Sequence, residues 1–254
     1  MLGDDLGLAL DPVRFARGVG LEPDPWQADV LRSDAQRLLL LCSRQSGKST
    51  TTALLALHTA IYRPDSLVLL LSPSLRQSGE LFRKVADFYR AMDDPPPPEA
   101  ESALRLELGN GSRIVSLPGR EQTIRGYSGV ALLVIDEAAR VLDDLYYSVR
   151  PMLAVSGGRL VAMSTPFGKR GFFFHEWTEG GASWKRVKVT AQDCPRISPA
   201  FLAEERAALG QLWYRQEYEC AFVETEESYF SAEAIMAAIS PEVAPLFDDY
   251  GGEW

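Results

Sequence analysis

Side chains that build metal clusters and disulfide frameworks are scarce in this sequence of 254 residues. It has two histidines and three cysteines, Cys42, Cys194 and Cys220, which follow no metal-ligand spacing and cannot all pair with one another. We therefore expect each cysteine to be a small buried apolar residue rather than a ligand. Asparagine occurs once, at Asn110, which weakly indicates a thermophilic source.

Long apolar runs and an excess of basic residues are also missing. There is no stretch of 18 or more apolar residues, and the first five residues lack the basic and then apolar order of a signal peptide. We therefore expect a soluble protein with no membrane segment. The net charge is −9, from 26 basic and 35 acidic residues, so contact with nucleic acid would require a local basic patch.

The composition is that of an ordinary globular protein, 46% hydrophobic and 24% charged. Short apolar runs at 67–71, 132–135 and 158–163 are typical of buried parallel strands, and helical periodicity separates them. Alternating segments at 104–108 and 113–117, joined through a Gly-Asn-Gly turn, predict a hairpin. These patterns predict an α/β fold with a mainly parallel sheet flanked by helices.

The stretch 43–50 follows an apolar run, 38–41, and is typical of a phosphate-binding loop. A buried strand that ends in small residues and opens a helix points N–H groups and the positive end of a helix dipole at one spot, which suits a polyphosphate. The strict loop pattern has glycine where this chain has Cys42. We expect Lys48 to contact phosphate and Ser49 to bind Mg²⁺, within a loop of Ser43, Arg44, Gln45, Ser46, Gly47, Lys48, Ser49 and Thr50.

Two adjacent carboxylates end the apolar run at 132–135. At the carboxyl end of a parallel strand, Asp136 is expected to face the loop and hold Mg²⁺ through its water shell, and Glu137 to polarise the attacking water. Acids at a strand end are common by themselves, but the loop upstream favours the functional interpretation. After the run at 158–163, Thr165 can sense a γ-phosphate by hydrogen bonding, although an ordinary turn has the same pattern.

Two further sets of residues have both a functional and a structural interpretation. Trp26 and Gln27 precede a helical pattern upstream of the loop. Gln27 can hydrogen-bond an adenine edge there while Trp26 packs nearby; the alternative is a helix N-terminus with a core tryptophan. Basic residues in or just after the predicted hairpin fit a solvated face as well as a DNA-contacting patch. They are Arg105, Arg113, Arg120 and Arg125.

The motifs at 43–50, at 132–137 and at Ser164-Thr165-Pro166 together resemble the ATPase domain of the large terminase subunit of tailed double-stranded DNA bacteriophages, the motor that packages DNA into a procapsid. The resemblance spans about residues 26–230, and a loop without its first glycine is characteristic of that family. It implies a P-loop NTPase core of the RecA-like ASCE type, with ATP and Mg²⁺ as cofactors.

The resemblance also assigns roles to single residues. Arg44 would be the loop arginine on the γ-phosphate side, Glu137 the catalytic carboxylate and Asp136 the acid associated with Mg²⁺. Trp26 and Gln27 would form the adenine-binding motif, and the segment 164–166 would couple hydrolysis to movement.

The family further implies an organisation and a set of partners. We expect an ATPase core at 1–190, a lid subdomain at 191–230 and a linker at 231–254. The acids and strands of a nuclease domain are absent from the sequence, so we expect no nuclease activity from it. The implied partners are double-stranded DNA, the portal protein, the small terminase subunit and four further copies in a ring, with a monomer in isolation. The implied location is the cytoplasm of the infected host, outside the mature virion.

An arginine must complete such a site in the transition state. Arg44 is the candidate within the same subunit, and Arg140, Arg120 and Arg125 are candidates from a neighbouring subunit. We favour Arg140, because it follows Glu137 closely. For the DNA we favour Arg105, Arg113 and Arg120, because a hairpin can project into a pore.

Two other functions share these motifs. A superfamily 1 or 2 helicase has the same glutamine, loop and acids, but it needs a second ATPase-like lobe, for which too little chain follows Thr165. A nucleotide-dependent assembly module would bind ATP without hydrolysing it. ATP turnover measured against protein concentration separates this module from a motor that is active only in its ring.

Overall fold

The computed structural model of the protein describes residues 2–119, 124 and 126–224. The chain divides into two compact units, Met1–Val223 and Glu224–Trp254. The first unit contains a sheet, the helices that cover it and the helices of the expected lid. The expected linker at 231–254, as well as Arg120 and Arg125, lies outside the described residues.

An eight-stranded sheet forms the centre of the first unit, with the strand order β3-β4-β5-β2-β6-β7-β1-β8. From β5 to β8 in this order all neighbours are parallel, whereas β3, β4 and β5 pair antiparallel at one edge. This topology confirms the α/β class and the mainly parallel sheet. The strands are β1 (Arg37–Cys42), β2 (Leu67–Ser72), β3 (Pro98–Ser102), β4 (Arg105–Leu108), β5 (Arg113–Pro118), β6 (Val130–Asp136), β7 (Arg159–Ser164) and β8 (Lys185–Val189).

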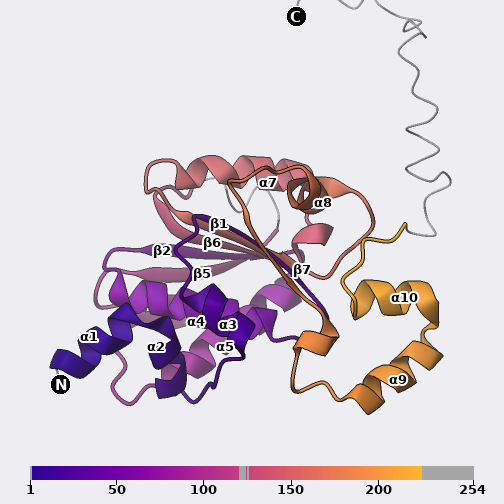
Figure 1. Ribbon diagram of the computed structural model, residues 1–254. Coiled ribbons are helices and arrows are strands. Elements are labelled where there is room, and N and C mark those ends of the chain that lie inside the picture. Colours follow the sequence, from indigo (N-terminus) through magenta and orange to yellow (C-terminus); the bar gives the residue numbers. More distant parts are fainter. Residues whose placement is uncertain (1, 120–123, 125, 225–254) are drawn as a thin grey trace, which may run out of the picture. The chain divides into compact units, whose positions relative to one another are not determined.

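Helices cover both faces of the sheet (Figure 1), with α1 to α5 on one face and α7 and α8 on the other. Short 3-10 turns, η1 (Ala138–Arg140), η2 (Arg150–Leu153) and η3 (Ala191–Asp193), lie between the longer elements. The helices are α1 (Leu2–Leu10), α2 (Pro12–Gly18), α3 (Pro25–Leu31), α4 (Lys48–Tyr62), α5 (Leu75–Arg90), α7 (Asp143–Val149), α8 (Gly171–Thr178), α9 (Pro199–Ala208) and α10 (Gly210–Glu217).

The strand β1 shows why the strand sequences are apolar without interruption. Leu38 and Leu40 belong to the hydrophobic cluster on the side of α2 to α5, and Leu39 and Leu41 belong to the cluster on the side of α7 and α8. Successive side chains of a strand point to opposite faces, so a strand covered on both faces must be apolar at every position. Because β1, β2, β6 and β7 run parallel, their carboxyl ends lie at one edge of the sheet, where the phosphate-loop motif and the two acids are found.

The predicted hairpin is present as β4 and β5, but its turn does not project from the molecule. The Asn110 side chain donates to the carbonyls of Ala60 and Ile61, at 2.9 and 3.0 Å. It thereby satisfies carbonyls that the C-terminus of α4 leaves unpaired. The turn is therefore held against the end of α4, and the expected DNA contacts of Arg105 and Arg113 stay a prediction.

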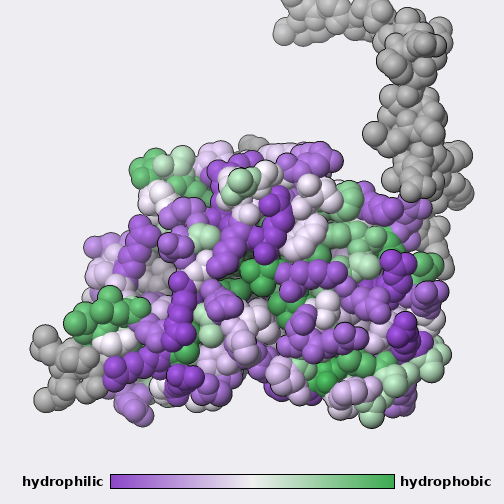
Figure 2. All heavy atoms as spheres, in the orientation of Figure 1, coloured by the Kyte–Doolittle hydropathy of each residue, from purple (hydrophilic) through white to green (hydrophobic). Residues whose placement is uncertain are grey.

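The helices α9 and α10 form a pair apart from the two helical layers (Figure 1). Tyr218, which follows α10, donates from its hydroxyl to Glu205 of α9 at 2.7 Å. Figure 2 shows apolar side chains at the surface in the region of these helices, and the exposed ones are Phe201, Leu209, Leu212 and Trp213. None of the helices within the described ranges is long and apolar enough to cross a membrane.

Candidate nucleotide-binding site

The loop 43–47 connects β1 to α4 and is held at several points. The N–H of Ser43 donates to the carbonyl of Val189 in β8 at 2.8 Å, and the hydroxyl of Ser46 donates to the Ser43 carbonyl at 2.9 Å. Gln45 and Gly47 have φ values of 57° and 99°, in the left-handed region. The expected strand, tight loop and helix are all present, and the unpaired N–H groups of the first turn of α4 lie next to the loop.

The structure brings the loop lysine together with the acid that directly follows β6. Nζ of Lys48 lies 3.3 Å from Oε1 of Glu137, and both side chains are largely buried. Glu137 directly follows β6 in a left-handed conformation, with φ 48°, and its N–H donates to Oδ1 of Asp136 at 2.9 Å. This turn separates the environments of the two adjacent carboxylates. Glu137 forms an ion pair with Lys48, whereas Asp136 is the last residue of β6.

Asp136 is an unusual aspartate because it is almost entirely buried. Burial and the neighbouring Glu137 raise the pKa of Asp136 to about 6, and Lys48 offsets only part of this rise. The positive charges near Asp136 therefore do not fully offset the cost of burying its ionised carboxylate. A divalent cation is the kind of partner that favours the ionised form of such a group.

Buried hydroxyls at neighbouring strand ends test whether the site suits Mg²⁺. Ser72 ends β2 and Ser164 ends β7, and the hydroxyl oxygen of each is buried without a hydrogen-bond partner among the described residues. Thr165, directly after Ser164, is also buried. Hydroxyl and carboxylate oxygens around a small polar space can bind Mg²⁺ directly or accept hydrogen bonds from the waters that it keeps. The chemistry of these residues therefore fits this ion, and the expected roles of Ser49 and Asp136 as its ligands stay a prediction.

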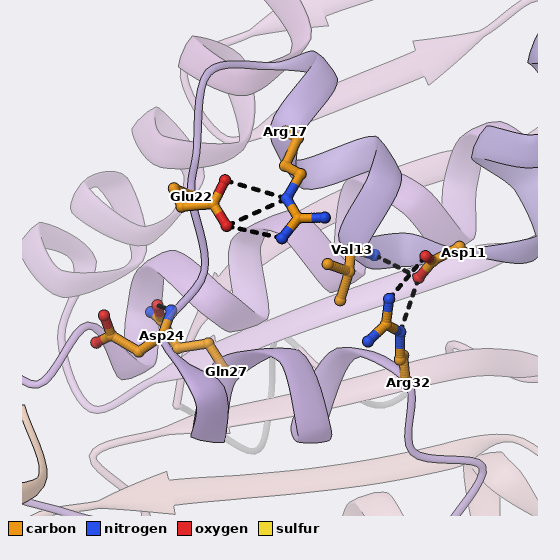
Figure 3. Close-up of polar contacts among 7 residues, drawn as sticks. All are labelled: Asp11, Val13, Arg17, Glu22, Asp24, Gln27 and Arg32. Carbon is orange, nitrogen blue, oxygen red and sulfur yellow. Dashed lines mark hydrogen bonds and ion pairs between the residues drawn. The ribbon is translucent and has the colours of Figure 1, made fainter.

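Trp26 and Gln27 lie in α3, and their side chains are committed to the protein. Oε1 of Gln27 accepts from the N–H of Asp24 at 2.8 Å, as Figure 3 shows, and Nε2 donates to Thr51 of α4 at 2.9 Å. The side chain of Gln27 is buried. Trp26 packs against the core, and its buried Nε1 has no partner among the described residues. Gln27 therefore couples α3 to α4, and the predicted contact with adenine stays a prediction.

Arg44 of the loop contacts α10, the last described helix, which belongs to the expected lid. Its Nε lies 2.5 Å from Oε2 of Glu217, and its backbone N–H donates to the Glu217 carbonyl at 3.2 Å. The guanidinium is mostly exposed, whereas the carboxylate of Glu217 is buried and also accepts from the Gln216 amide. The predicted contact between Arg44 and a γ-phosphate would therefore require this ion pair to open.

Arg140 lies in η1 and contacts residues of its own subunit. Its Nε is 3.8 Å from Oε2 of Glu137, and its guanidinium carbon lies 4.1 Å from the ring centre of Phe167. The same residue lines an open cleft of about 560 Å³ together with Arg170. Arg140 is thus beside the expected catalytic acid, at a surface that a second protein can reach.

Two of the expected DNA contacts lie around one acid. Arg105 forms an ion pair with Glu107, and Arg113 is directly opposite Glu107 in the antiparallel register of β4 and β5. Both arginines are exposed. The two arginines are not equivalent candidates, because the Glu107 carboxylate is paired with Arg105 and offsets its positive charge.

Three residues near the site were missed by the sequence interpretation. Lys84 of α5 donates to Thr50 at 3.3 Å, Glu217 pairs with Arg44, and Arg196 donates to the carbonyl of Ser46 at 2.9 Å. All three come from segments without a recognisable motif. Glu217 and Arg196 are at least 150 positions away from their loop partners, so no local pattern could have found them.

Comparison with known proteins identifies the family. Residues 39–236 match the family described as terminase large subunit, T4likevirus-type, N-terminal. The chain belongs to this family. The match includes the loop, both acids and the segment 164–166, so it covers every motif that carried the resemblance, whereas Trp26 and Gln27 lie before it.

The relatives agree with this assignment. The terminase large subunit of Thermus phage G20c is 27% identical over an alignment of 253 positions, which covers 86% of this chain and 52% of that protein. The chain thus spans about half the length of the curated relatives that it matches. The large terminase ATPase domain of Thermus phage P74-26 shares the fold, with a TM-score of 0.73 at 23% identity, covering 83% of this chain and 98% of that one.

Another solved relative is the large terminase of a thermophilic bacteriophage in complex with ATP-gamma-S, which has a TM-score of 0.62 at 15% identity. The structural match covers 79% of this chain and 53% of that protein. These likenesses confirm the expected ATPase-type fold of the terminase core.

Proposed function

We propose that this chain hydrolyses ATP and is the ATPase part of a motor that packages double-stranded DNA. The convergence of Lys48, Asp136 and Glu137 at the carboxyl ends of β1 and β6 is the observation that carries the proposal. Phosphoryl transfer needs a phosphate cradle, an acid for a metal ion and a group that orients water. Membership of the terminase family and the relative solved in complex with ATP-gamma-S support it.

The residues of the chain divide the work of hydrolysis in this proposal. The N–H groups of the loop and Lys48 hold the phosphates, and Glu137 orients the attacking water and accepts its proton after Lys48 has turned to the phosphate. Ser49 and Asp136 would hold Mg²⁺, which when bound neutralises charge on the phosphate oxygens. In this proposal the main rearrangement at the centre of the site is the move of Lys48 from Glu137 to the phosphate.

The remaining site residues surround this centre. Trp26 and Gln27 hold the adenine side through α3, and Thr165 senses the γ-phosphate from the end of β7. Arg44 leaves Glu217 to contact the γ-phosphate, while the other loop residues, Ser43, Gln45, Ser46, Gly47 and Thr50, shape the cradle. The place of Arg44 in the loop and the buried position of Thr165 directly after β7 support these roles, whereas the ion pair of Arg44 with Glu217 has to open first.

The positive charge from a neighbouring subunit is assigned to Arg140 in this proposal. Its place on an open cleft supports the assignment, but the residue would first have to leave Glu137 and Phe167. Mixing Glu137→Gln subunits with Arg140→Ala subunits in an assembled motor tests it. Partial activity in the mixture supports action of Arg140 on the site of a neighbouring subunit. An inactive mixture would mean that Arg140 acts on the site of its own subunit.

The partners follow from the family in the same way. We propose that the protein acts in the cytoplasm of an infected host, as a ring of five copies on the portal protein, with the small terminase subunit. Backbone contacts that do not read sequence suffice to hold DNA in such a ring. Arg105, Arg113 and Arg120 are the proposed contacts.

One titration tests the activity itself. Phosphate release from ATP is measured with and without Mg²⁺ over a wide range of protein concentration, for the wild type and for Glu137→Ala. Turnover that depends on Mg²⁺, rises with concentration and is lost in the variant is expected of a motor that is active in its ring. Nucleotide binding without turnover at any concentration would instead identify an assembly module.

A further inference from the structure

Arg196 links two parts of the candidate site that are far apart in the sequence. It lies between η3 and α9, in the segment that leads from the sheet into the lid. Its Nη1 donates to Oδ1 of Asp24 at 2.8 Å and lies 2.7 Å from Oδ2 of the same carboxylate, while its Nη2 donates to the Ser46 carbonyl at 2.9 Å. One guanidinium thus joins the start of α3 to the phosphate loop.

We propose that Arg196 is the nucleotide-positioning residue of this site: it holds the phosphate loop in its binding shape and fixes the adenine-side helix α3 against it. The proposal rests on the proposed ATP site and adds to it a residue from the lid side of the chain. Neither the loop motif nor the acids after β6 include this residue.

The contact with Ser46 has a direct effect on the loop amides. In a trans peptide, the carbonyl and the next N–H point in opposite directions. A donor that holds the Ser46 carbonyl on the side of Arg196 therefore turns the N–H of Gly47 to the other side. Loop N–H groups that share one direction are what an anion site requires.

The surroundings of Gly47 show how closely Arg196 fits. A Cβ atom at this position would lie 2.8 Å from Nε2 of Gln27 and 3.2 Å from Nη2 of Arg196. The Gln27 amide and the guanidinium therefore both pack against the one residue of the loop that has no side chain. The position of the loop relative to α3 is set by these two groups together.

The contact with Asp24 carries the same constraint to α3. Asp24 is the residue before the first turn of α3, and its N–H is bound by Gln27 in that turn (Figure 3). Its side chain is 10% exposed, compared with 50% for Arg196. A planar guanidinium can bind a carboxylate and a carbonyl at once, whereas an ammonium group on the shorter reach of lysine serves one of them well.

Binding and hydrogen exchange together test the role. Arg196→Ala and Arg196→Lys are compared with Arg17→Ala, a matched control that removes an exposed arginine bound side-on to Glu22 (Figure 3). For Arg196→Ala we expect the dissociation constants of ATP and ADP to rise about tenfold, since hydrogen bonds to charged groups are strong but this one is half exposed. Arg196→Lys should fall between Ala and the wild type, and Arg17→Ala should match the wild type.

Hydrogen exchange without nucleotide makes the result independent of activity. In Arg196→Ala, hydrogen exchange should accelerate at the amides of 44–50 but not in α5. In steady-state turnover, KM should rise while kcat stays within about twofold of the wild-type value. Unchanged exchange and unchanged dissociation constants would overturn the role of Arg196 while leaving the ATP site intact. If the wild type binds neither ATP nor ADP, the proposed function itself fails, and the nucleotide role of Arg196 with it. If Arg196→Ala does not fold, Arg196→Lys and Asp24→Asn supply the same comparison.

Discussion

Lys48 and Glu137 form an ion pair across the carboxyl ends of β1 and β6, with 3.3 Å between Nζ and Oε1. The side chain proposed to hold phosphate and the side chain proposed to orient water therefore neutralise one another. An incoming polyphosphate has to compete with Glu137 for Lys48, and success in this competition releases the carboxylate for its own role. Phosphate binding by Lys48 and the release of Glu137 as the proposed base are therefore linked through one ion pair.

Glu137→Gln should separate binding from hydrolysis. We expect ATP binding to be unchanged or tighter, because Lys48 loses its competing partner, and phosphate release to fall by about 100-fold or more, in the range known for general bases. A single-turnover assay beside a direct binding measurement checks both. Glu80→Gln is the control, because Glu80 is an exposed acid paired with Arg83 in the same helix. Hydrolysis near the wild-type rate would show that another group orients the water.

Glu217→Gln should raise the affinity for ATP while leaving that for ADP unchanged. Arg44 has to leave the Glu217 carboxylate to reach a γ-phosphate, and the neutral amide holds it less strongly. The expected gain is about two- to fivefold, because the guanidinium is exposed and such ion pairs are weak. Competition binding with ATP and ADP measures it. An equal gain for both nucleotides would mean that Arg44 does not distinguish the γ-phosphate.

Two glycine substitutions should have opposite effects. Gly47→Ala places a Cβ atom 2.8 Å from Gln27 in a backbone conformation with φ 99°, so it should abolish nucleotide binding and lower stability. Gly79 lies inside α5, where a Cβ atom meets no atom within 4 Å. Gly79→Ala should therefore raise stability by about 0.5–1 kcal/mol. Thermal unfolding and nucleotide binding of both variants check the contrast, and equal effects would contradict the loop geometry.

Acid should destabilise the protein through His58. Burial lowers the pKa of His58 below its ordinary value of about 6.5, while its Nε2 lies 3.0 Å from the Leu8 carbonyl. The unfolded chain then binds a proton that the folded state does not, so this contribution to stability is complete above pH 6.5 and is lost as the pH falls through the lowered pKa.

Denaturant unfolding at pH 7.5 and at pH 5 measures the effect of His58. The decrease in stability should be smaller in His58→Gln and unchanged in His175→Gln, whose histidine is exposed on α8. The comparison must be between variants, because the raised pKa of Asp136 acts in the opposite direction.

The two hairpin arginines should differ in their effect on DNA. Arg113→Glu should weaken binding to double-stranded DNA and reduce the salt slope by about 1, as expected when one phosphate contact is lost. Arg105→Glu should weaken it less in the same filter-binding assay, because Glu107 already neutralises Arg105. ATP turnover without DNA serves as the control. Unchanged DNA affinity in both variants would exclude β4 and β5 from the DNA path.

The sequence was sufficient for the parts of the fold that depend on local pattern. Local pattern predicted the strands β1, β2, β6 and β7, the helices α4 and α5 and the hairpin. Strands buried on both faces appear as apolar runs, and helices appear as apolar residues at helical spacing. The strand β3 and the helix α8 were missed. Four prolines lead into β3 and an all-aromatic turn opens α8, and both obscure periodicity.

The site was predictable only where its residues are neighbours in sequence. Lys48, Asp136 and Glu137 were found because each belongs to a short motif at a strand end. The partners that orient them were not, since the contacts of Glu217 and Arg196 with the loop arise from the return of the chain after β8. The commitment of Gln27 to Thr51 was equally hidden, because it depends on how two helices pack.

The turn at Asn110 ties the end of α4 to one side chain that can lose its amide. Asn110 is the sole asparagine of the chain, it is followed by glycine, and its amide nitrogen serves the last carbonyls of the helix that begins at Lys48. Asparagine before glycine is the sequence that loses its amide most readily with age. An aspartate at this position would present negative oxygen to those carbonyls in place of a donor, so the slow chemistry of one side chain would loosen the C-terminal end of α4.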